Sequence, residues 1–528
     1  MNEEDCNVMR ISSPIITEYF ERTAKDNPNP AIRWGKGNIL SWQALYTKAR
    51  HLAQYLVHER DISPGECVAI CMERSPEFLV AAYAVLLAGG VYFPVDAKTP
   101  VARLASMLTT ARCRLAFCSE AQTGTLLKAG MGLELILQEQ LHEIERLHSD
   151  GATAESLPPV VAADPAYLIF TSGSTGAPKG VLVNHGAFIN RLAWHQAHSA
   201  MTAVDIILQR TALTFDVSLW ELFLPTLNGG SHYLLQPRFE SFPKAVAAAL
   251  ESEGITLVHF VPSLLKPVLQ ELHSIPSSSL AALRKVYVSG ESLSASLVQQ
   301  FQQQFGMRCL LTNLYGPTEA AIDVSYYDCL EPAPAAIPIG QPLTGCDLYI
   351  VDPETRTLKD EGAIGEIAIG GICLAEGYYN RPDLTGEAFI VHPQLGERIY
   401  LTGDLGWYQE GRGFFCQGRK DTQVKLRGLR IELGEIEHHL LSHPAVTEAV
   451  ACVVEDDAAE QWLVAAIVGS APLDPQALRQ YLAAQMPVYM LPARYWQTGQ
   501  LPRSSSGKLD RKTIAATMRA QFFSEMVA

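Results

Sequence analysis

Apolar and polar positions follow two different periods along the first 160 residues. Residues 41–55 and 77–87 repeat apolar side chains at helical spacing, whereas residues 67–71 and 91–95 are short apolar runs typical of buried strands. Ser41 offers an N-cap to the first helix, and two glycines at 89 and 90 end the second. This alternation predicts α/β layers with largely parallel sheets.

The pattern changes twice further along the chain. Strand-like runs recur at 257–261, 285–288 and 308–314, and from about residue 336 short runs broken by Gly and Pro, such as 365–371, predict a smaller β-rich subdomain. The last 90 residues favour strands near 447–454 and 462–468 and a helix over 474–485. We therefore expect a large N-terminal domain over residues 1–420, built of two α/β subdomains and the β-rich one, and a small α+β domain over residues 421–528.

Composition narrows the class of protein. The 528 residues are too many for one compact core, and the formal net charge of −15 argues against nonspecific binding to nucleic acid or to an anionic membrane. No apolar run is long enough to span a bilayer, and no secretory signal opens the chain. The 11 cysteines lack metal-ligand spacing and are typical of free thiols. We expect a cytoplasmic protein with neither nucleic acid nor membrane as a partner.

The clearest chemical motif lies between residues 167 and 181. A strand-like run breaks into a loop of small and hydroxyl residues, and Lys179 follows; the loop is Thr171, Ser172, Gly173, Ser174, Thr175 and Gly176. Small residues let the backbone approach an anion, hydroxyl and N–H groups donate to phosphate oxygens, and a lysine adds a point charge. No Gly-Lys-Ser/Thr closes the loop, so it is not a Walker A sequence. On composition alone, a solvated turn would be the commoner explanation.

Two further motifs place polar groups beside predicted strands. Residues 313–319 follow an apolar strand, and a Gly-Pro pair forces a turn at its carboxyl end, where ligands bind in α/β sheets. Tyr315 offers a flat ring for a base, and Glu319 suits a hard cation such as Mg²⁺. Asp404 follows an expected tight turn and suits the vicinal hydroxyls of a ribose. Taken singly, each motif has an ordinary explanation as a turn or a helix cap.

Charged residues gather between residues 418 and 435, and one lysine stands apart near the C-terminus. A solvated charged hairpin would explain the charge run, and the alternative is a hinge at Asp421 between two domains, with Gly428 marking a close backbone approach. Lys508 lies in a loop rich in Ser and Gly. Such a lysine is usually a surface residue, but a mobile loop can deliver its cation where charge develops on a carboxylate and a phosphate.

In their order and separation, these segments resemble the motifs of adenylate-forming enzymes, and in particular the adenylation domains of nonribosomal peptide synthetases. Residues 86–96, 215–221, 365–371, 378–382 and 486–492 resemble further motifs of that family, so the resemblance covers nearly the whole chain. Leu401 departs from the family, which usually has a basic residue there.

The resemblance implies an activity and a set of nucleotide-binding residues. Such enzymes join a carboxylate to the α-phosphate of ATP, release pyrophosphate and pass the acyl group to a thiol. By resemblance, Glu319 and Thr171 bind Mg²⁺, and Lys508 bridges the substrate carboxylate and the nucleotide, so these three form the implied catalytic set. The small domain would then swing about Asp421, withdraw Lys508 and bring Gly428 to the thiol. The implied ATP-binding residues are Thr171, Ser172, Gly173, Ser174, Thr175, Gly176, Lys179, Tyr315, Gly316, Thr318, Asp404 and Arg419.

The resemblance also implies a substrate. Asp216 stands where the family places the carboxylate that pairs with the α-amino group of an amino acid. The implied pocket, which is similar to the family pattern for serine, is Asp216, Val217, Trp220, His259, Tyr287, Ser289, Leu314, Ile322, Asp323 and Lys508. A site built to bond a hydroxyl can reject the deoxy analogue by roughly 10⁴-fold. The alternative for His259 is an ordinary core histidine.

We therefore expect an ATP- and Mg²⁺-dependent ligase that adenylates L-serine and loads the phosphopantetheine thiol of a carrier protein in trans, since no carrier domain follows Lys508. Three questions stay open. The substrate could be D-serine or a diamino acid, the chain could be an excised part of a larger synthetase, and the enzyme could need a small accessory protein. The main alternative is an acyl- or aryl-CoA ligase of the same fold, which would not need Asp216. A scaffold without activity is disfavoured by the intact Lys179, Glu319 and Asp404.

Overall fold

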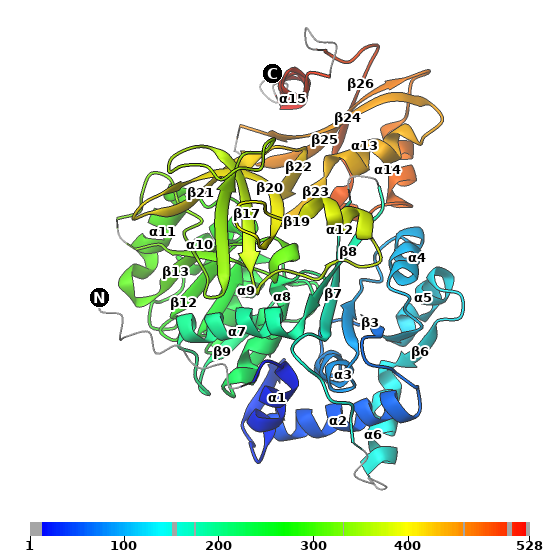
Figure 1. Cartoon of the computed structure of the whole chain (residues 1–528), viewed down its shortest axis with the longest axis vertical. Helices are drawn as coiled ribbons and strands as arrows, with labels where there is room; N and C mark the ends of the chain where they lie inside the picture. Colours follow the sequence, from blue (N-terminus) through cyan, green and yellow to red (C-terminus); the bar gives the residue numbers. More distant parts are fainter. Residues whose placement is uncertain are drawn as a thin grey trace.

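The structure is a computed structural model that describes residues 13–149, 156–173, 176–330, 332–457, 460–503 and 509–523. Two large α/β layers and a small antiparallel sheet make up most of it, and the C-terminal part forms a separate small sheet with its own helices (Figure 1). The mixed α/β class, with a large N-terminal and a small C-terminal part, is the one that the sequence predicts.

The larger layer is a nine-stranded sheet in the order β15-β14-β13-β12-β11-β9-β10-β1-β2. Its interior is parallel from β1 to β13, and antiparallel pairs occur at both edges. Its strands are β1 (Pro30–Trp34), β2 (Asn38–Ser41), β9 (Ile206–Gln209), β10 (Ser231–Leu234), β11 (Leu257–Phe260), β12 (Lys285–Val288), β13 (Leu310–Tyr315), β14 (Ser325–Asp328) and β15 (Gln341–Pro342). The strand predicted over 308–314 begins only at Leu310, because residues 306–308 form a 3₁₀ turn.

The second layer is a seven-stranded sheet in the order β18-β8-β7-β4-β3-β5-β6. It is parallel from β7 to β6, and β8 and β18 add antiparallel strands at one edge. Its strands are β3 (Cys67–Cys71), β4 (Val91–Pro94), β5 (Leu115–Cys118), β6 (Glu134–Leu137), β7 (Pro165–Thr171), β8 (Lys179–Asn184) and β18 (Gly377–Tyr378).

One hydrophobic core joins the two layers, because apolar faces of both sheets and of the helices between them bury one another. In α3 every residue from Phe78 to Leu87 is buried. The helices of this core are α1 (Ile16–Ala24), α2 (Trp42–His58), α3 (Pro76–Leu87), α7 (His185–Ser199) and α8 (Val217–Phe223). The predicted cap of α2 is confirmed, since Ser41 accepts the Ala44 N–H at 3.1 Å.

Further helices cover the outer faces of the sheets. Those packed on the nine-stranded sheet are α9 (Pro243–Ser252), α10 (Pro262–Leu272) and α11 (Ala295–Phe305), and those on the seven-stranded sheet are α4 (Val101–Thr110) and α5 (Thr123–Ala129). Helix α6 (Leu141–Ser149) lies against α2.

The β-rich subdomain is a five-stranded antiparallel sheet with helix α12 (Pro382–Ala388) beside it. Its strands are β16 (Cys346–Val351), β17 (Gly365–Gly371), β19 (Phe389–Val391), β20 (Arg398–Gln409) and β21 (Gly413–Arg419). The tight turn expected before Asp404 is absent from this part of the structure. Asp404 instead lies within β20, where residues 402–404 bulge out of register with β17 and Gly403 takes a φ of 76°.

The C-terminal part begins with a hairpin and continues as a three-stranded sheet with helices on both faces. Its elements are β22 (Gln423–Leu426), β23 (Leu429–Glu432), α13 (Leu433–Leu441), β24 (Val446–Glu455), β25 (Gln461–Gly469), α14 (Pro475–Ala483), β26 (Arg494–Thr498) and α15 (Arg511–Phe523). The predicted helix over 474–485 is present, capped by Asp474, and ends at Ala483.

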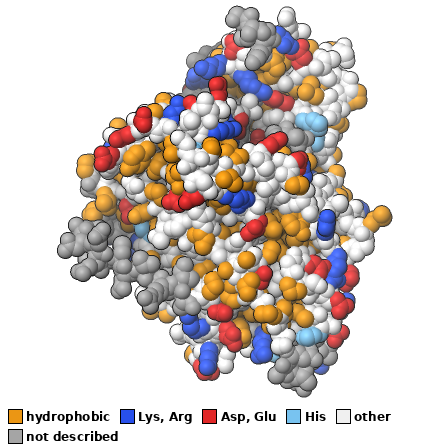
Figure 2. Space-filling model, in the orientation of Figure 1, with side chains coloured by type: hydrophobic (Ala, Val, Ile, Leu, Met, Phe, Trp, Pro, Cys, Tyr) orange, Lys and Arg blue, Asp and Glu red, His pale blue; other side chains and the backbone are white. Residues whose placement is uncertain are grey.

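The surface carries both signs of charge. On the face drawn in Figure 2, acidic and basic side chains are interspersed among apolar ones. Within the described residues, no helix has the length and apolar character needed to cross a membrane.

Candidate active site

The loop between β7 and β8 has the backbone that close approach requires. A Cβ at Gly173 would collide with the carbonyl oxygen of Ala177, so this position needs glycine. The Thr171 hydroxyl lies 3.5 Å from the carbonyl oxygen of Lys179, at the point where the two antiparallel strands meet. Ser174 and Thr175 lie outside the described residues, so their part in phosphate binding stays a prediction.

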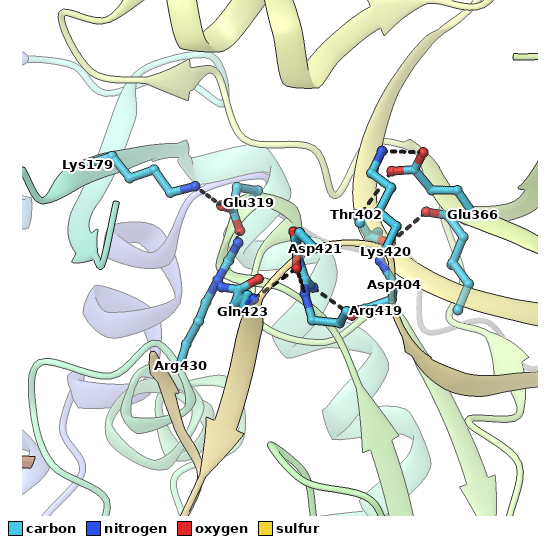
Figure 3. A network of polar contacts seen from close by, with 12 residues as sticks. Lys179, Glu319, Glu366, Thr402, Asp404, Arg419, Lys420, Asp421, Gln423 and Arg430 are labelled. Atoms are coloured by element: carbon cyan, nitrogen blue, oxygen red, sulfur yellow. Dashed lines mark hydrogen bonds and ion pairs between the residues drawn. The ribbon is translucent and has the colours of Figure 1, made fainter. Parts of the chain in front are cut away.

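Glu319 lies at the centre of a buried cluster of charges. It follows β13 in a short 3₁₀ turn and is fully buried, with Oε1 accepting from the Tyr378 hydroxyl at 2.7 Å and Oε2 from Arg430 Nη1 at 2.7 Å. Lys179 Nζ stands 3.7 Å from Oε1 (Figure 3). Burial alone would raise the pKa of Glu319, but the charges of Arg430 and Lys179 lower it to about 2. Glu319 is therefore an ionised carboxylate that already binds cationic groups.

The loop after β7 is in contact with an anion supplied by the C-terminal part. Oε2 of Glu435, a fully buried residue of α13, accepts the Gly173 N–H at 3.3 Å, and its other oxygen pairs with Arg103 of α4. The Ser172 hydroxyl donates to the carbonyl oxygen of Arg430 at 3.1 Å. The Gly173 N–H of the predicted phosphate loop thus binds a carboxylate, and Glu319, the predicted metal ligand, binds a guanidinium. The first is a contact that a phosphate could replace, and the second is one that a metal cation could replace.

The predicted adenine and ribose residues form a connected chain. The Tyr315 hydroxyl, at the carboxyl end of β13, donates to Asp404 Oδ2 at 2.6 Å. Arg419 Nη1 donates to Asp404 Oδ1 at 2.6 Å, and the same guanidinium binds both oxygens of Asp421 at 2.7 Å (Figure 3). Lys425 Nζ lies 5.5 Å from the centroid of the Tyr315 ring. One arginine therefore joins the predicted ribose ligand to the predicted hinge residue.

The turn after Tyr315 also needs glycine. A Cβ at Gly316 would collide with the backbone of Ile322 and Asp323, two predicted pocket residues. The segment that carries the predicted adenine-binding motif therefore packs directly on two predicted substrate-binding residues.

The charged run after residue 418 includes a hairpin, and one of its two turn residues, Gly428, packs against the large domain. Arg427 and Gly428 form the two-residue turn, both with positive φ, 53° and 74°, as a type I′ turn requires. The Gly428 N–H donates to Glu291 Oε1 at 2.6 Å, and a Cβ at Gly428 would collide with the Val261 side chain. The tip therefore lies against the carboxyl ends of β11 and β12, in agreement with a close backbone approach.

Asp216 is the half-buried N-cap residue of α8. Its Oδ1 accepts the Val217 N–H at 2.8 Å. Burial raises the pKa of Asp216 to about 6, and Asp323 and Glu319 add to that rise while the Thr318 hydroxyl opposes it. Trp220, one helical turn further on, is fully buried, and its ring centroid lies 5.7 Å from that of Tyr287.

Polar pocket residues come from neighbouring strands. His259 of β11 pairs in register with Tyr287 of β12, and His259 Nε2 lies 2.9 Å from the Ser289 hydroxyl. His259 Nδ1 is buried with no hydrogen-bond partner among the described residues, so this histidine is not a fully satisfied core residue. Val217, Leu314 and Ile322 share the apolar core with Trp220 and Tyr287. Lys508 lies outside the described residues.

Several site residues were missed by the sequence analysis. Asp323 Oδ2 accepts from Arg191 Nη2 at 2.6 Å, and Arg191 belongs to α7, which carried no motif. Arg430 and Glu435 stood within the charged run but could not be assigned to Glu319 and Gly173. The only signal for Arg191 is that it shares one face of an otherwise buried helix with His195 and His198.

Known proteins resemble this chain over most of its length. The AMP-binding enzyme family matches residues 20–379, and the AMP-binding enzyme C-terminal domain matches residues 435–508. Zwittermicin A synthase ZmaJ of Bacillus cereus is 37% identical over 511 residues, 95% of each chain. Enterobactin synthase component F of Escherichia coli (strain K12) is 36% identical over 512 residues, which are 94% of this chain and 38% of that protein.

Solved structures give the same picture. PA1221, described as an NRPS protein containing adenylation and PCP domains, has a TM-score of 0.82 at 26% identity, covering 96% of this chain and 85% of that one. The o-succinylbenzoate CoA synthetase MenE of Bacillus subtilis shares the fold, with a TM-score of 0.81 at 21% identity over 94% of this chain and 97% of that one.

Proposed function

Because the chain belongs to the AMP-binding enzymes, with adenylation proteins of nonribosomal peptide synthesis among its relatives, we propose that it adenylates an amino acid, L-serine, and then transfers it to a thiol. The observation that carries the amino acid assignment is Asp216, a half-buried carboxylate with a raised pKa that stands among predicted pocket residues such as His259 and Ser289. A carboxylate partly withdrawn from water gains from a cationic partner, and the α-ammonium group of an amino acid supplies one.

The same site accounts for nucleotide binding. The residues fit ATP with Mg²⁺, because the Gly173 N–H already binds a carboxylate and Glu319 already binds cations. The phosphates would be held by the loop after β7, which consists of Thr171, Ser172, Gly173, Ser174, Thr175 and Gly176, together with Lys179. The base would be bordered by Tyr315, Gly316 and Thr318, and the ribose would be held by Asp404 and Arg419. A Mg²⁺ held by Glu319 and Thr171 would offset phosphate charge during adenylation. Lys508 would neutralise the charge that builds between the carboxylate and the α-phosphate.

The predicted pocket residues support a small hydroxyl substrate. Trp220 and Tyr287 are fully buried, with ring centroids 5.7 Å apart, and two such large side chains would shorten a pocket beyond Asp216. The Tyr287 hydroxyl is already engaged by His198 Nδ1 at 3.1 Å, which leaves the His259 and Ser289 pair to meet the substrate hydroxyl. An alanine side chain would leave the buried His259 Nδ1, which has no hydrogen-bond partner among the described residues, still without one, at a cost of about 1–3 kcal/mol.

The described arrangement of the two domains suits the second half-reaction. The hairpin tip at Gly428 is inserted against Val261 and Glu291, and Arg430 and Glu435 take positions that we assign to the cation and the phosphates. We place the domain boundary between residues 420 and 421, with Asp421 as the hinge. Adenylation would then use the other arrangement, in which Lys508 faces the site.

The thiol donor that we propose is the phosphopantetheine arm of a carrier protein that binds in trans. Relatives support this partner, since PA1221 contains adenylation and PCP domains and ZmaJ matches the chain almost end to end. A cytoplasmic location belongs to the same proposal. The alternative is a CoA ligase, which the fold shared with o-succinylbenzoate CoA synthetase favours and Asp216 disfavours.

ATP–pyrophosphate exchange across a panel of amino acids and acyl acids tests the proposal. Serine should give the fastest exchange, and Asp216→Asn should abolish it, whereas Asp347→Asn, an exposed aspartate of β16, should not. Exchange that is faster with threonine, alanine or glycine would overturn serine. Exchange that needs no α-amino group would instead favour the CoA ligase.

A further inference from the structure

Helix α7 presents a buried guanidinium to the substrate pocket. Arg191 is only 1% exposed, and its two terminal nitrogens have separate partners: Nη2 donates to Asp323 Oδ2 at 2.6 Å, and Nη1 lies 3.0 Å from His195 Nδ1. The His195 ring in turn packs against Trp220 and Tyr287, with centroids 4.2 and 4.3 Å away. Arg191 therefore contacts the predicted pocket residue Asp323 directly, and it contacts Trp220 and Tyr287 indirectly, through the His195 ring that packs against them.

The segment that Arg191 holds is strained. Ala321 and Ile322 both have positive φ, 49° and 83°, and a β-branched residue in that region is a genuine outlier. Such strain persists only where the surroundings fix it. Asp323 is fixed on one side by close packing on Gly316 and on the other by Arg191. The ion pair thus sets the position of Ile322 and Asp323 in the pocket wall.

The charges around the pocket can be counted. A guanidinium has no acceptor, so His195 must accept at Nδ1 and is neutral; burial and then Arg191 lower the pKa of His195 well below its ordinary value. Burial and then the neighbouring arginines Arg210 and Arg191 likewise lower the pKa of His259. Asp323 is balanced by Arg191, which leaves Asp216 as the one carboxylate of the pocket available to a cationic substrate group.

We propose that Arg191 is the specificity-determining residue that restricts this pocket to amino acids with an uncharged side chain. The inference rests on the proposed amino acid adenylation and narrows it, because it separates serine from diamino acids. By neutralising Asp323, Arg191 leaves room for one ammonium group, at Asp216. The second ammonium of L-2,3-diaminopropionate, which is close to serine in size, would be buried beside a guanidinium with no carboxylate to pair with.

The test compares kcat/KM in ATP–pyrophosphate exchange for L-serine and L-2,3-diaminopropionate at pH 7. The wild-type protein should prefer serine. Arg191→Gln exposes the charge of Asp323 to the pocket, so serine activity should fall about 100-fold and the ratio of diaminopropionate to serine should rise at least about 10-fold. Arg191→Lys keeps the charge and should leave that ratio within about threefold of wild type.

Two further variants separate specificity from folding. Arg191→Gln combined with Asp323→Asn removes both charges, and it should regain the serine preference and the thermal stability that Arg191→Gln alone loses. Arg284→Gln breaks another Arg–Asp pair, with Asp205, at the opposite end of β12 and should leave the ratio unchanged. An unchanged ratio in Arg191→Gln, or a double variant that still prefers diaminopropionate, would overturn the inference.

The outcomes also distinguish this inference from the proposed function. A wild-type protein that prefers another uncharged amino acid would disprove serine, and the same ratio would then be measured with that amino acid and its ammonium analogue. A wild-type preference for a cationic side chain would overturn the role of Arg191 and leave adenylation itself intact.

Discussion

Asp216 combines partial burial with the need to carry a charge when substrate is bound. Its Oδ1 accepts the Val217 N–H at 2.8 Å, but burial and the charges of two further carboxylates, Asp323 and Glu319, raise its pKa and disfavour its anionic form. An incoming α-ammonium group would supply the missing partner. A proton and the α-ammonium group of the substrate therefore compete for the same carboxylate, Asp216.

This competition predicts a pH profile. Because burial raises the pKa of Asp216 to about 6, the free enzyme is protonated there below about pH 6 and cannot pair with an ammonium. We expect kcat/KM for the amino acid to fall about tenfold per pH unit below that point and to be level above it. Exchange assays from pH 5 to 8 at saturating ATP would measure this.

The corresponding profile for ATP is the control, since Glu319 has its pKa lowered to about 2 and stays ionised throughout this range. A profile for the amino acid without a bend between pH 5 and 7 would show that Asp216 does not govern its binding.

Residues were predictable where local sequence carries the chemistry. Two sequence motifs suggested a chemical role for Gly173 and for Tyr315, Gly316 and Glu319. In the structure, the last three residues lie together at the carboxyl end of β13. Arg191 was not predictable, because its partner Asp323 is 132 positions away and only the packing of α7 brings the two together.

At the scale of elements, the hairpin of β22 and β23 reaches the site from the C-terminal part, beside Glu435 of α13. Its type I′ turn gives a narrow tip, and the tip lies where any side chain at Gly428 would meet Val261. The fit is thus set by the backbone of one glycine.

Gly428→Ala should therefore impair thioester formation and leave adenylation nearly unchanged. The added Cβ both collides with Val261 and forces a non-glycine residue to positive φ, which costs about 1 kcal/mol or more. Carrier loading by a single-turnover assay should fall at least about 10-fold, while ATP–pyrophosphate exchange stays within about twofold. Gly411→Ala is the matched control, because Gly411 also has positive φ, 72°, but its Cβ would meet nothing. Equal losses in the two half-reactions of Gly428→Ala would contradict this role of the hairpin.

Several strands and helices followed from periodicity, as at β3, β12 and α3, because their apolar runs are buried. The structure around Asp404 could not be predicted from the sequence pattern. A Thr-Gly-Asp sequence is common in turns, whereas here it is a bulge in a twelve-residue strand whose continuation depends on pairing with β17 and β21.

For the whole molecule, the arrangement of the two domains rests on a few polar contacts across their interface. Arg103 and Glu435 form a buried pair, Arg430 binds Glu319, and the Gly428 N–H binds Glu291. The Arg430 contact uses Glu319, which we assign to cation binding, and Glu435 also accepts the Gly173 N–H, which we assign to phosphate binding. Bound ATP and this arrangement should therefore exclude one another.

Arg103→Ala should destabilise the arrangement, because Glu435 would stay buried without its partner, at a cost of about 3–5 kcal/mol. The arrangement of the two domains can be followed by energy transfer between dyes at Leu127→Cys and Val488→Cys, two exposed sites on the two domains, in a Cys416→Ser background. We expect the domain arrangement seen in the structure to become less populated in Arg103→Ala, and also in the wild-type protein when Mg²⁺-pyrophosphate is added. Arg114→Ala, which breaks a partly exposed pair with Glu66, should not. An unchanged transfer efficiency with pyrophosphate would contradict mutual exclusion.

The domain arrangement was beyond the reach of the sequence analysis. A boundary near residue 420 stays a prediction from the change in composition, and the contacts between the large and small parts join residues such as Arg103 and Glu435, 332 positions apart. No local pattern relates two such positions.

The Arg419 bridge has a consequence for how long the nucleotide product stays bound. One guanidinium holds Asp404, the proposed ribose ligand, and Asp421, the proposed hinge, and it cannot keep both contacts once the chain turns at residue 421. Binding of AMP at Asp404 and rotation of the small domain about Asp421 would then be thermodynamically coupled: each would change the equilibrium of the other by the same factor. The affinity of the protein for AMP would accordingly differ between the two arrangements of the small domain.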